Sequence, residues 1–158
     1  ESKVGDRIGY VVKSDVFSGG DLKEHPATPR KARLMATDPL HDLALLADYA
    51  PPEHLSASIS MEPVETGMKV YAMGAPLGML FSYSSGDVAA VRYVTSHGHE
   101  ILFIQTTTPI SGGSSGGGLY NVYGELVGIC HATFTRGQNM NLFIHYQYVA
   151  DLLRKVGI

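Results

Sequence analysis

The chain has 158 residues, of which 44% are hydrophobic and 17% charged, and its formal net charge at pH 7 is −3. This length and balance are ordinary for one globular domain with its own hydrophobic core. The negative charge and the lack of a Lys or Arg cluster argue against a nucleic-acid-binding surface. No run of about 18 apolar residues is present to span a membrane. The single cysteine, Cys130, cannot form an internal disulfide.

Short β-strands dominate the predicted secondary structure. Nine runs have strand character, and turn-forming residues separate them: Arg7–Lys13, Lys31–Thr37, Leu43–Ala47, Lys69–Met73, Asp87–Arg92, Ile101–Gln105, Gly117–Asn121, Glu125–His131 and Met140–His145. Many short strands at this spacing predict an antiparallel barrel or sandwich. Apolar residues at helical spacing between Tyr148 and Val156 predict a closing amphipathic helix over 147–156.

A weak division falls near residues 50–62, where Pro51-Pro52 precedes a Ser-rich stretch. It fits a link between two halves of one compact unit, and it fits equally well a surface loop of a single barrel.

A glycine- and serine-rich segment carries the strongest functional signal. Residues 104–119 read Ile-Gln-Thr-Thr-Thr-Pro-Ile-Ser-Gly-Gly-Ser-Ser-Gly-Gly-Gly-Leu, between two apolar runs. A serine flanked by glycines can project from a tight turn as a nucleophile, which is the role this pattern suggests for Ser115. The N–H groups of Gly113 and Ser115 would then form an oxyanion hole. The alternative is a flexible Gly/Ser loop with no chemistry.

Three blocks of sequence, taken in chain order, are informative together. The first is Ala36–Leu46, the second is Met73–Gly78 followed by Ser85–Val88, and the third runs from Ile104 through Leu119 to Ile129. Together they resemble the trypsin-like serine proteases of the HtrA (Deg) type, over residues 30–156. The resemblance implies an all-β fold, a chymotrypsin-like double antiparallel β-barrel with a C-terminal helix. It implies an N-terminal barrel portion over about 1–55, a C-terminal barrel over 62–146 and a closing helix over 147–156.

The same resemblance implies roles for individual residues. Ser115 matches the nucleophile, Asp42 the triad acid, and Gly113 with Ser115 the donors of the oxyanion hole. The aspartate would hold the imidazole of a histidine base, which takes the serine proton. By itself Asp42 has the character of a turn residue. The chain departs from the family at Ser114, where an asparagine is common, and at Gly118, which we expect to loosen the loop.

The histidine base is the serious departure. In this family it precedes the aspartate in a Thr-x-x-His or Asn-His-Val block, and no such block occurs here. We therefore expect the first hairpin and the base to lie before Glu1. Within the chain, His25 fits an exposed loop residue. His41 adjoins Asp42, and on a strand the two side chains would point to opposite faces, so that Asp42 could not hold it.

The remaining histidines have weaker functional interpretations. His97 and His99 are spaced for a metal, but two ligands from one turn make a poor site, and we expect no metal. His131 follows Gly128-Ile129 on the strand beside the expected specificity pocket, where it binds substrate or is simply a satisfied strand-end histidine. His145, near the end of the last strand, is expected to be a satisfied structural histidine. His54 lies in a loop.

Two functions compete on these observations. The first is a serine endopeptidase acting through an acyl-enzyme on Ser115, with no metal or organic cofactor. Its substrate is a polypeptide bound along strand edges, and its predicted substrate-binding residues are Pro109, Ile110, His131, Ala132 and Thr133. The absence of an acidic residue at the expected pocket base argues against cleavage after Lys or Arg and favours small-to-medium uncharged side chains. The second is a catalytically inactive module for protein binding or structure.

The resemblance also bears on partners and location. It implies an extracytoplasmic, periplasmic or secreted, protein. Glycine-rich catalytic loops often allow an inactive state that a partner orders, so an activating or scaffolding protein is a further expected partner.

Overall fold

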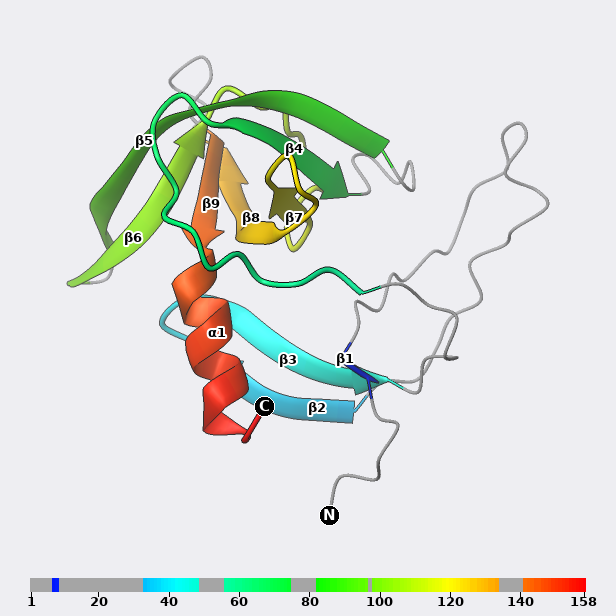
Figure 1. Cartoon of the computed structure of the whole chain (residues 1–158). Coiled ribbons are helices and arrows are strands. Elements are labelled where there is room, and N and C mark those ends of the chain that lie inside the picture. Colours follow the sequence, from blue (N-terminus) through cyan, green and yellow to red (C-terminus); the bar gives the residue numbers. More distant parts are fainter. Residues whose placement is uncertain (1–6, 9–32, 49–55, 75–81, 97, 134–140) are drawn as a thin grey trace. The chain divides into compact units, whose positions relative to one another are not determined.

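Antiparallel strands make up nearly all of the regular structure (Figure 1). The computed structural model describes residues 7–8, 33–48, 56–74, 82–96, 98–133 and 141–158. By its contacts the chain divides into two units. The first consists of Glu1–Ser56 with Asp151–Ile158, and the second of Ala57–Ala150.

The first unit contains a three-stranded sheet in the order β1-β3-β2. Strands β2 (Arg33–Asp38) and β3 (Leu43–Asp48) form an antiparallel hairpin, and β1 (Arg7–Ile8) pairs with the other edge of β3. Leu45 and Ala47 on β3 are buried, as alternate residues on one face of a strand must be when that face packs inward. The rest of the first predicted strand, residues 9–13, lies outside the described residues.

The second unit is a closed antiparallel barrel in the order β4-β5-β6-β9-β8-β7, with β7 pairing back to β4 (Figure 1). Its strands are β4 (Lys69–Gly74), β5 (Ser82–Ser96), β6 (His99–Thr106), β7 (Gly118–Tyr120), β8 (Leu126–Thr133) and β9 (Asn141–His145). Closure leaves no free sheet edge within the ring of strands. The predicted all-β architecture is confirmed.

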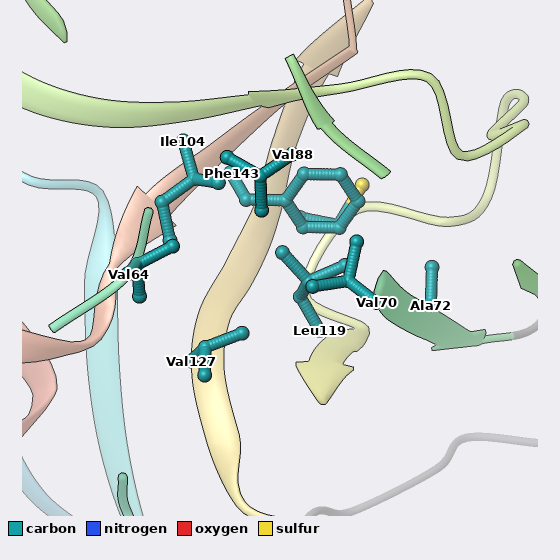
Figure 2. Close-up of a cluster of buried hydrophobic side chains, with 9 residues drawn as sticks. Val64, Val70, Ala72, Val88, Ile104, Leu119, Val127 and Phe143 are labelled. Carbon is teal, nitrogen blue, oxygen red and sulfur yellow. The ribbon is translucent and has the colours of Figure 1, made fainter. Parts of the chain in front are cut away.

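One apolar cluster fills the barrel. Figure 2 shows the ring of Phe143 among the side chains of Val70, Val88 and Leu119. These four are essentially inaccessible to solvent, and each comes from a different strand of the barrel. Burial of four such side chains contributes about 1.5 to 3 kcal/mol each, which makes this cluster the main stabilising element of the second unit.

Strand β5 is much longer than the six residues predicted from the sequence. The prediction was too short because Ser-Ser-Gly at 84–86 has the composition of a turn. The first part of the strand pairs with β4 and its second part with β6, so both halves stay extended. Gly86 lies in the strand because a Cβ there would come within 3.0 Å of the backbone of Thr108. The glycine therefore permits a close backbone approach and does not end the strand.

Helix α1 (Tyr146–Lys155) follows β9 directly, within the region where the sequence predicts a closing helix. His145 caps it, because its ring Nδ1 accepts a hydrogen bond from the N–H of Gln147 at 3.2 Å. Capping in this way satisfies one of the free N–H groups of the first turn. The hydroxyl of Tyr148 accepts a further hydrogen bond from the N–H of Leu102 on β6 at 2.9 Å. No helix in the described part of the chain is long and apolar enough to cross a membrane.

The buried cap makes stability depend on pH. Burial lowers the pKa of His145 below its ordinary value of 6.5, and protonation would also place a positive charge at a helix N-terminus. As the pH falls through 6.5 the unfolded chain takes up this proton before the folded chain does, so the free energy of unfolding decreases until the folded-state pKa is passed. Urea denaturation between pH 5 and 8 measures this. A His145→Asn variant keeps a capping group without the titration, and an identical pH slope in both proteins would contradict the prediction.

Candidate active site

Ser115 lies in the second of two consecutive β-turns that share Ser114. In the first turn the N–H of Ser114 donates to the carbonyl of Ser111 at 2.9 Å, and in the second the N–H of Gly117 donates to the carbonyl of Ser114 at 3.0 Å. Each turn has a glycine with positive φ at its third position, Gly113 at 93° and Gly116 at 83°. A type II turn requires this conformation, which explains the placing of these two glycines.

The barrel anchors the end of this loop at one residue of β8. The N–H of Gly116 donates to the carbonyl of Cys130 at 2.9 Å, and the N–H of Cys130 donates to the carbonyl of Gly117 at 2.8 Å. A Cβ on Gly117 would come closer than 3.0 Å to the carbonyl oxygens of Met73 and Ser114, so that only glycine fits there. Ser115 therefore lies two residues before Gly117, where the close approach of neighbouring backbone fixes the position of the chain.

The side chains of Ser114 and Ser115 have opposite environments. Ser114 is buried, and its hydroxyl accepts a hydrogen bond from the N–H of Ser111 at 3.3 Å, as expected for a side chain pointing away from the surface. Ser115 is exposed, and its hydroxyl lies 3.5 Å from the carbonyl of His131, at the outer limit of a hydrogen bond. Within the described residues, no hydrogen bond uses the N–H of Gly113 or Ser115.

Gly118 has a different role from the loosening expected of it. It is buried at the start of β7, and a Cβ there would overlap the ring of Tyr120. The phenol of Tyr120 thus occupies the space that a side chain at 118 would need. The ring of Tyr120 therefore fills the space beside Gly118, and the strand is packed at this point.

A cavity of about 270 Å³ opens beside the turns. It lies between the ends of β4 and β5, the 109–114 segment and β8. Its lining residues are Ala72, Met73, Gly74, Ser82, Tyr83, Ser84, Pro109, Ile110, Ser111, Ser114 and Cys130. Two of the five predicted substrate-binding residues, Pro109 and Ile110, are among them. His131 is not, and the side chains of Ala132 and Thr133 lie outside those that the structure describes.

The described lining of this cavity is uncharged. It combines apolar surface with four serine hydroxyls. Ser84 donates to the carbonyl of Pro109 at 2.5 Å, and the hydroxyl of Ser114 accepts the N–H of Ser111 at 3.3 Å. Cys130 contributes a thiol, and burial raises its pKa to about 11. The thiol is thus un-ionised at neutral pH and behaves as a small apolar group.

Asp42, the predicted triad acid, belongs to the first unit and Ser115 to the second. Asp42 is exposed and ends the turn between β2 and β3 with φ at 55°, a left-handed conformation that aspartate tolerates better than most residues. The strand geometry that we applied to His41 and Asp42 does not hold, because both residues lie in this turn. The ring Nδ1 of His41 is 2.7 Å from Oδ2 of Asp38, the last residue of β2.

Asp38 is not among the site residues predicted from the sequence. Its carboxylate is mostly buried and accepts a second hydrogen bond from the backbone N–H of His41, at 3.3 Å to Oδ1. Burial alone would raise the pKa of Asp38, but the two hydrogen bonds and the charges of His41 and Lys155 outweigh burial and lower it below 3.8. The available signal was the dipeptide Asp38-Pro39. As at a helix N-cap, an aspartate before a proline can accept the N–H of the residue three positions later, which here is His41.

The other histidines divide into described and undescribed ones. His25, His54 and His97 lie outside the described residues. His99 is exposed at the start of β6, and the ring of His131 lies 5.4 Å from that of Phe103. His145 is hydrogen-bonded, which confirms its interpretation as a satisfied structural histidine. Among the described residues no group of three or more His, Cys, Asp or Glu is arranged to hold a metal ion.

Comparison with known proteins decides the family. A family profile described as a trypsin-like peptidase domain matches residues 6–129. The chain belongs to the trypsin-like peptidase domain family. Its match includes both Asp42 and Ser115, together with the turns around the serine.

Relatives of this peptidase domain confirm the HtrA-type resemblance. A probable periplasmic DegP-like serine endoprotease of Halomonas elongata is 38% identical over 162 residues, covering 94% of this chain and 34% of that protein. One of Marinomonas sp. is 36% identical over 135 residues, covering 81% of this chain and 28% of that protein. The chain thus spans about a third or less of the length of these curated relatives.

Solved structures support the fold of the peptidase domain. The HtrA-type protease AlgW, solved with a decapeptide, superposes with a TM-score of 0.72 at 22% identity, over 84% of this chain and 42% of that one. The active form of the Rv3671c protease of M. tuberculosis gives 0.70 at 23% identity, over 84% and 61%. The predicted chymotrypsin-like fold is confirmed, whereas the assignment of residues 1–55 to a first barrel stays a prediction.

The crossing at Gly117 leads to a stability prediction. Replacing Gly117 with Ala should lower the free energy of unfolding by about 1 to 3 kcal/mol, because the new methyl group meets backbone that the barrel holds in place. The matched control is Gly112→Ala in the same loop, which meets no atom within 4 Å and has no positive φ. It should change stability by no more than about 1 kcal/mol in either direction. Urea denaturation followed by circular dichroism compares the two, and equal effects would rule out the steric argument.

The environment of Cys130 leads to a reactivity prediction. With a pKa of about 11, only about a thousandth of the thiol is ionised at pH 8. Because alkylation requires the thiolate, iodoacetamide should modify the native protein far more slowly than the urea-unfolded protein at this pH. Intact-mass spectrometry over time measures both rates. Similar rates in the two states would show that the thiol is not buried as described.

Proposed function

We propose that this chain is the protease domain of a serine endopeptidase that cleaves peptide bonds through an acyl-enzyme on Ser115. The observation that carries the proposal is the pair of turns, which exposes the Ser115 hydroxyl beside two N–H groups that make no hydrogen bond among the described residues. Such N–H groups stabilise a developing oxyanion, commonly the largest single contribution to catalysis.

The reaction follows from these parts. The Ser115 oxygen attacks the scissile carbonyl carbon while a histidine base, expected before Glu1, takes the hydroxyl proton. The N–H groups of Gly113 and Ser115 bind the resulting oxyanion, and Asp42 orients and stabilises the imidazolium. Collapse of the intermediate breaks the C–N bond, and the imidazolium gives its proton to the leaving amine. Water then attacks the acyl-enzyme by the same route and releases the carboxylate product.

The cavity supports the choice of substrate. Its described lining has no charged side chain, which favours a small-to-medium uncharged substrate side chain over Lys or Arg. Pro109 and Ile110 would contact that side chain, and we extend the proposed lining to Met73 and Tyr83. His131, Ala132 and Thr133 are proposed to bind substrate outside this cavity, along the edge of β8. The relatives, which are named as serine endoproteases, support a polypeptide substrate.

The names of the relatives support an extracytoplasmic location. An activating or scaffolding protein partner remains part of the proposal.

The competing function is an inactive module on the same fold. Absence of the histidine base would favour it, since losing that base costs roughly six orders of magnitude in turnover. That loss corresponds to about 8 kcal/mol of activation free energy.

Fluorophosphonate labelling distinguishes the two functions. The full-length gene product that contains this chain should gain one adduct by intact mass, and the adduct should disappear in Ser115→Ala. Ser58→Ala, which removes an exposed hydroxyl in the same unit, should label like the unaltered protein. Labelling of residues 1–158 alone would place the base within the chain, contrary to the proposal. No labelling of either form would favour the inactive module.

A further inference from the structure

The carboxylate of Asp38 makes two contacts with the turn that ends at Asp42. Oδ1 of Asp38 accepts the backbone N–H of His41 at 3.3 Å, and Oδ2 lies 2.7 Å from Nδ1 of the same residue. Both side chains are largely shielded from solvent, with exposed fractions of 12% for Asp38 and 14% for His41. One side chain thus fixes both the backbone and the ring of the residue next to Asp42. We call this pair the Asp38–His41 clasp.

The clasp acts on a turn with little other freedom. Asp38 pairs across the hairpin with Leu43, the residue after Asp42, so four residues connect β2 and β3. Pro39 has a fixed φ and no N–H to donate, which suits the first position after a capping aspartate. Asp42 must then enter β3 from a left-handed conformation, with φ at 55°. Left-handed geometry at a residue with a side chain persists only where the surroundings impose it.

We propose that Asp38 is a positioning residue, which through its clasp on His41 holds Asp42 in the conformation from which it acts as triad acid. This inference rests on the proposed function, because it assigns Asp38 an effect on catalysis through Asp42. The charge on Asp38 favours the clasp, since it strengthens both hydrogen bonds. The alternative is that the clasp only stabilises the hairpin.

Catalytic and structural roles differ in their kinetic consequences. In the full-length protein, Asp38→Ala should lower the maximal fluorophosphonate labelling rate by about 10- to 100-fold through misplacement of the acid. The probe concentration for half-maximal rate should stay the same, because the clasp does not touch the probe. Asp38→Asn keeps an acceptor for the His41 N–H, so its maximal labelling rate should lie between those of the unaltered protein and Asp38→Ala. The matched control is Asp151→Ala, which should leave labelling unchanged. Asp151 is an exposed aspartate of the same unit that pairs with Arg154 on α1.

A double-mutant cycle tests whether Asp38 acts through Asp42. Asp42→Asn alone should slow labelling by about 10⁴-fold. In that background Asp38→Ala should cause no more than about a twofold further change, since the acid it positions is already lost. An equal loss in both backgrounds would overturn the inference, because it would show a route that bypasses Asp42.

The outcomes separate this inference from the proposed function. If the unaltered protein does not label, the proposed function fails and the inference fails with it. If it labels and Asp38→Ala labels equally fast, the inference alone is overturned. Circular dichroism checks folding of each variant. Where Asp38→Ala does not fold, Asp38→Asn and His41→Ala take its place in the cycle, and unchanged rates in both would equally overturn the inference.

Discussion

The geometry around Ser115 depends on a backbone crossing that leaves no room for a side chain. At Gly117 the chain passes close to the carbonyl oxygens of Met73 and Ser114, while the backbone of Cys130 makes two hydrogen bonds with Gly116 and Gly117. Strand β7 has only three residues, yet it closes the barrel between β4 and β8. A glycine-rich segment loses much conformational entropy on ordering, so its order here must come from the closed barrel. The interpretation as a flexible loop does not account for these contacts.

Strand positions could be predicted from the sequence because each strand has an inward apolar face. Val70, Val88 and Phe143 all lie within predicted strands, and they meet in one core. The length of β5 could not be predicted, because Ser-Ser-Gly has the composition of a turn. Contacts with β4 and with the backbone of Thr108, distant in sequence, override that local preference.

The candidate site was predicted only in part, because some of its residues come together only in the folded barrel. The motif gave the serine and its glycines, since their turn conformations are local properties. Of the residues that line the cavity beside them, only Pro109 and Ile110 were predicted to bind substrate, because Met73, Tyr83 and Cys130 come from three strands that meet only in the folded barrel. His41 was given strand geometry together with Asp42, but the strand begins only at Leu43. The carboxylate that orders His41 lies three residues earlier, at the end of the preceding strand.

The division of the chain into units has a consequence for biosynthesis. The barrel unit is one continuous stretch, Ala57–Ala150, whereas the other unit combines Glu1–Ser56 with the last eight residues, Asp151–Ile158. A ribosome therefore delivers every residue of the barrel before it delivers the segment that completes the first unit. The barrel can become ordered during elongation, while the nascent first unit stays incomplete. The hairpin that carries Asp42 thus gains Lys155, whose charge acts on Asp38, only when residues 151–158 have left the exit tunnel.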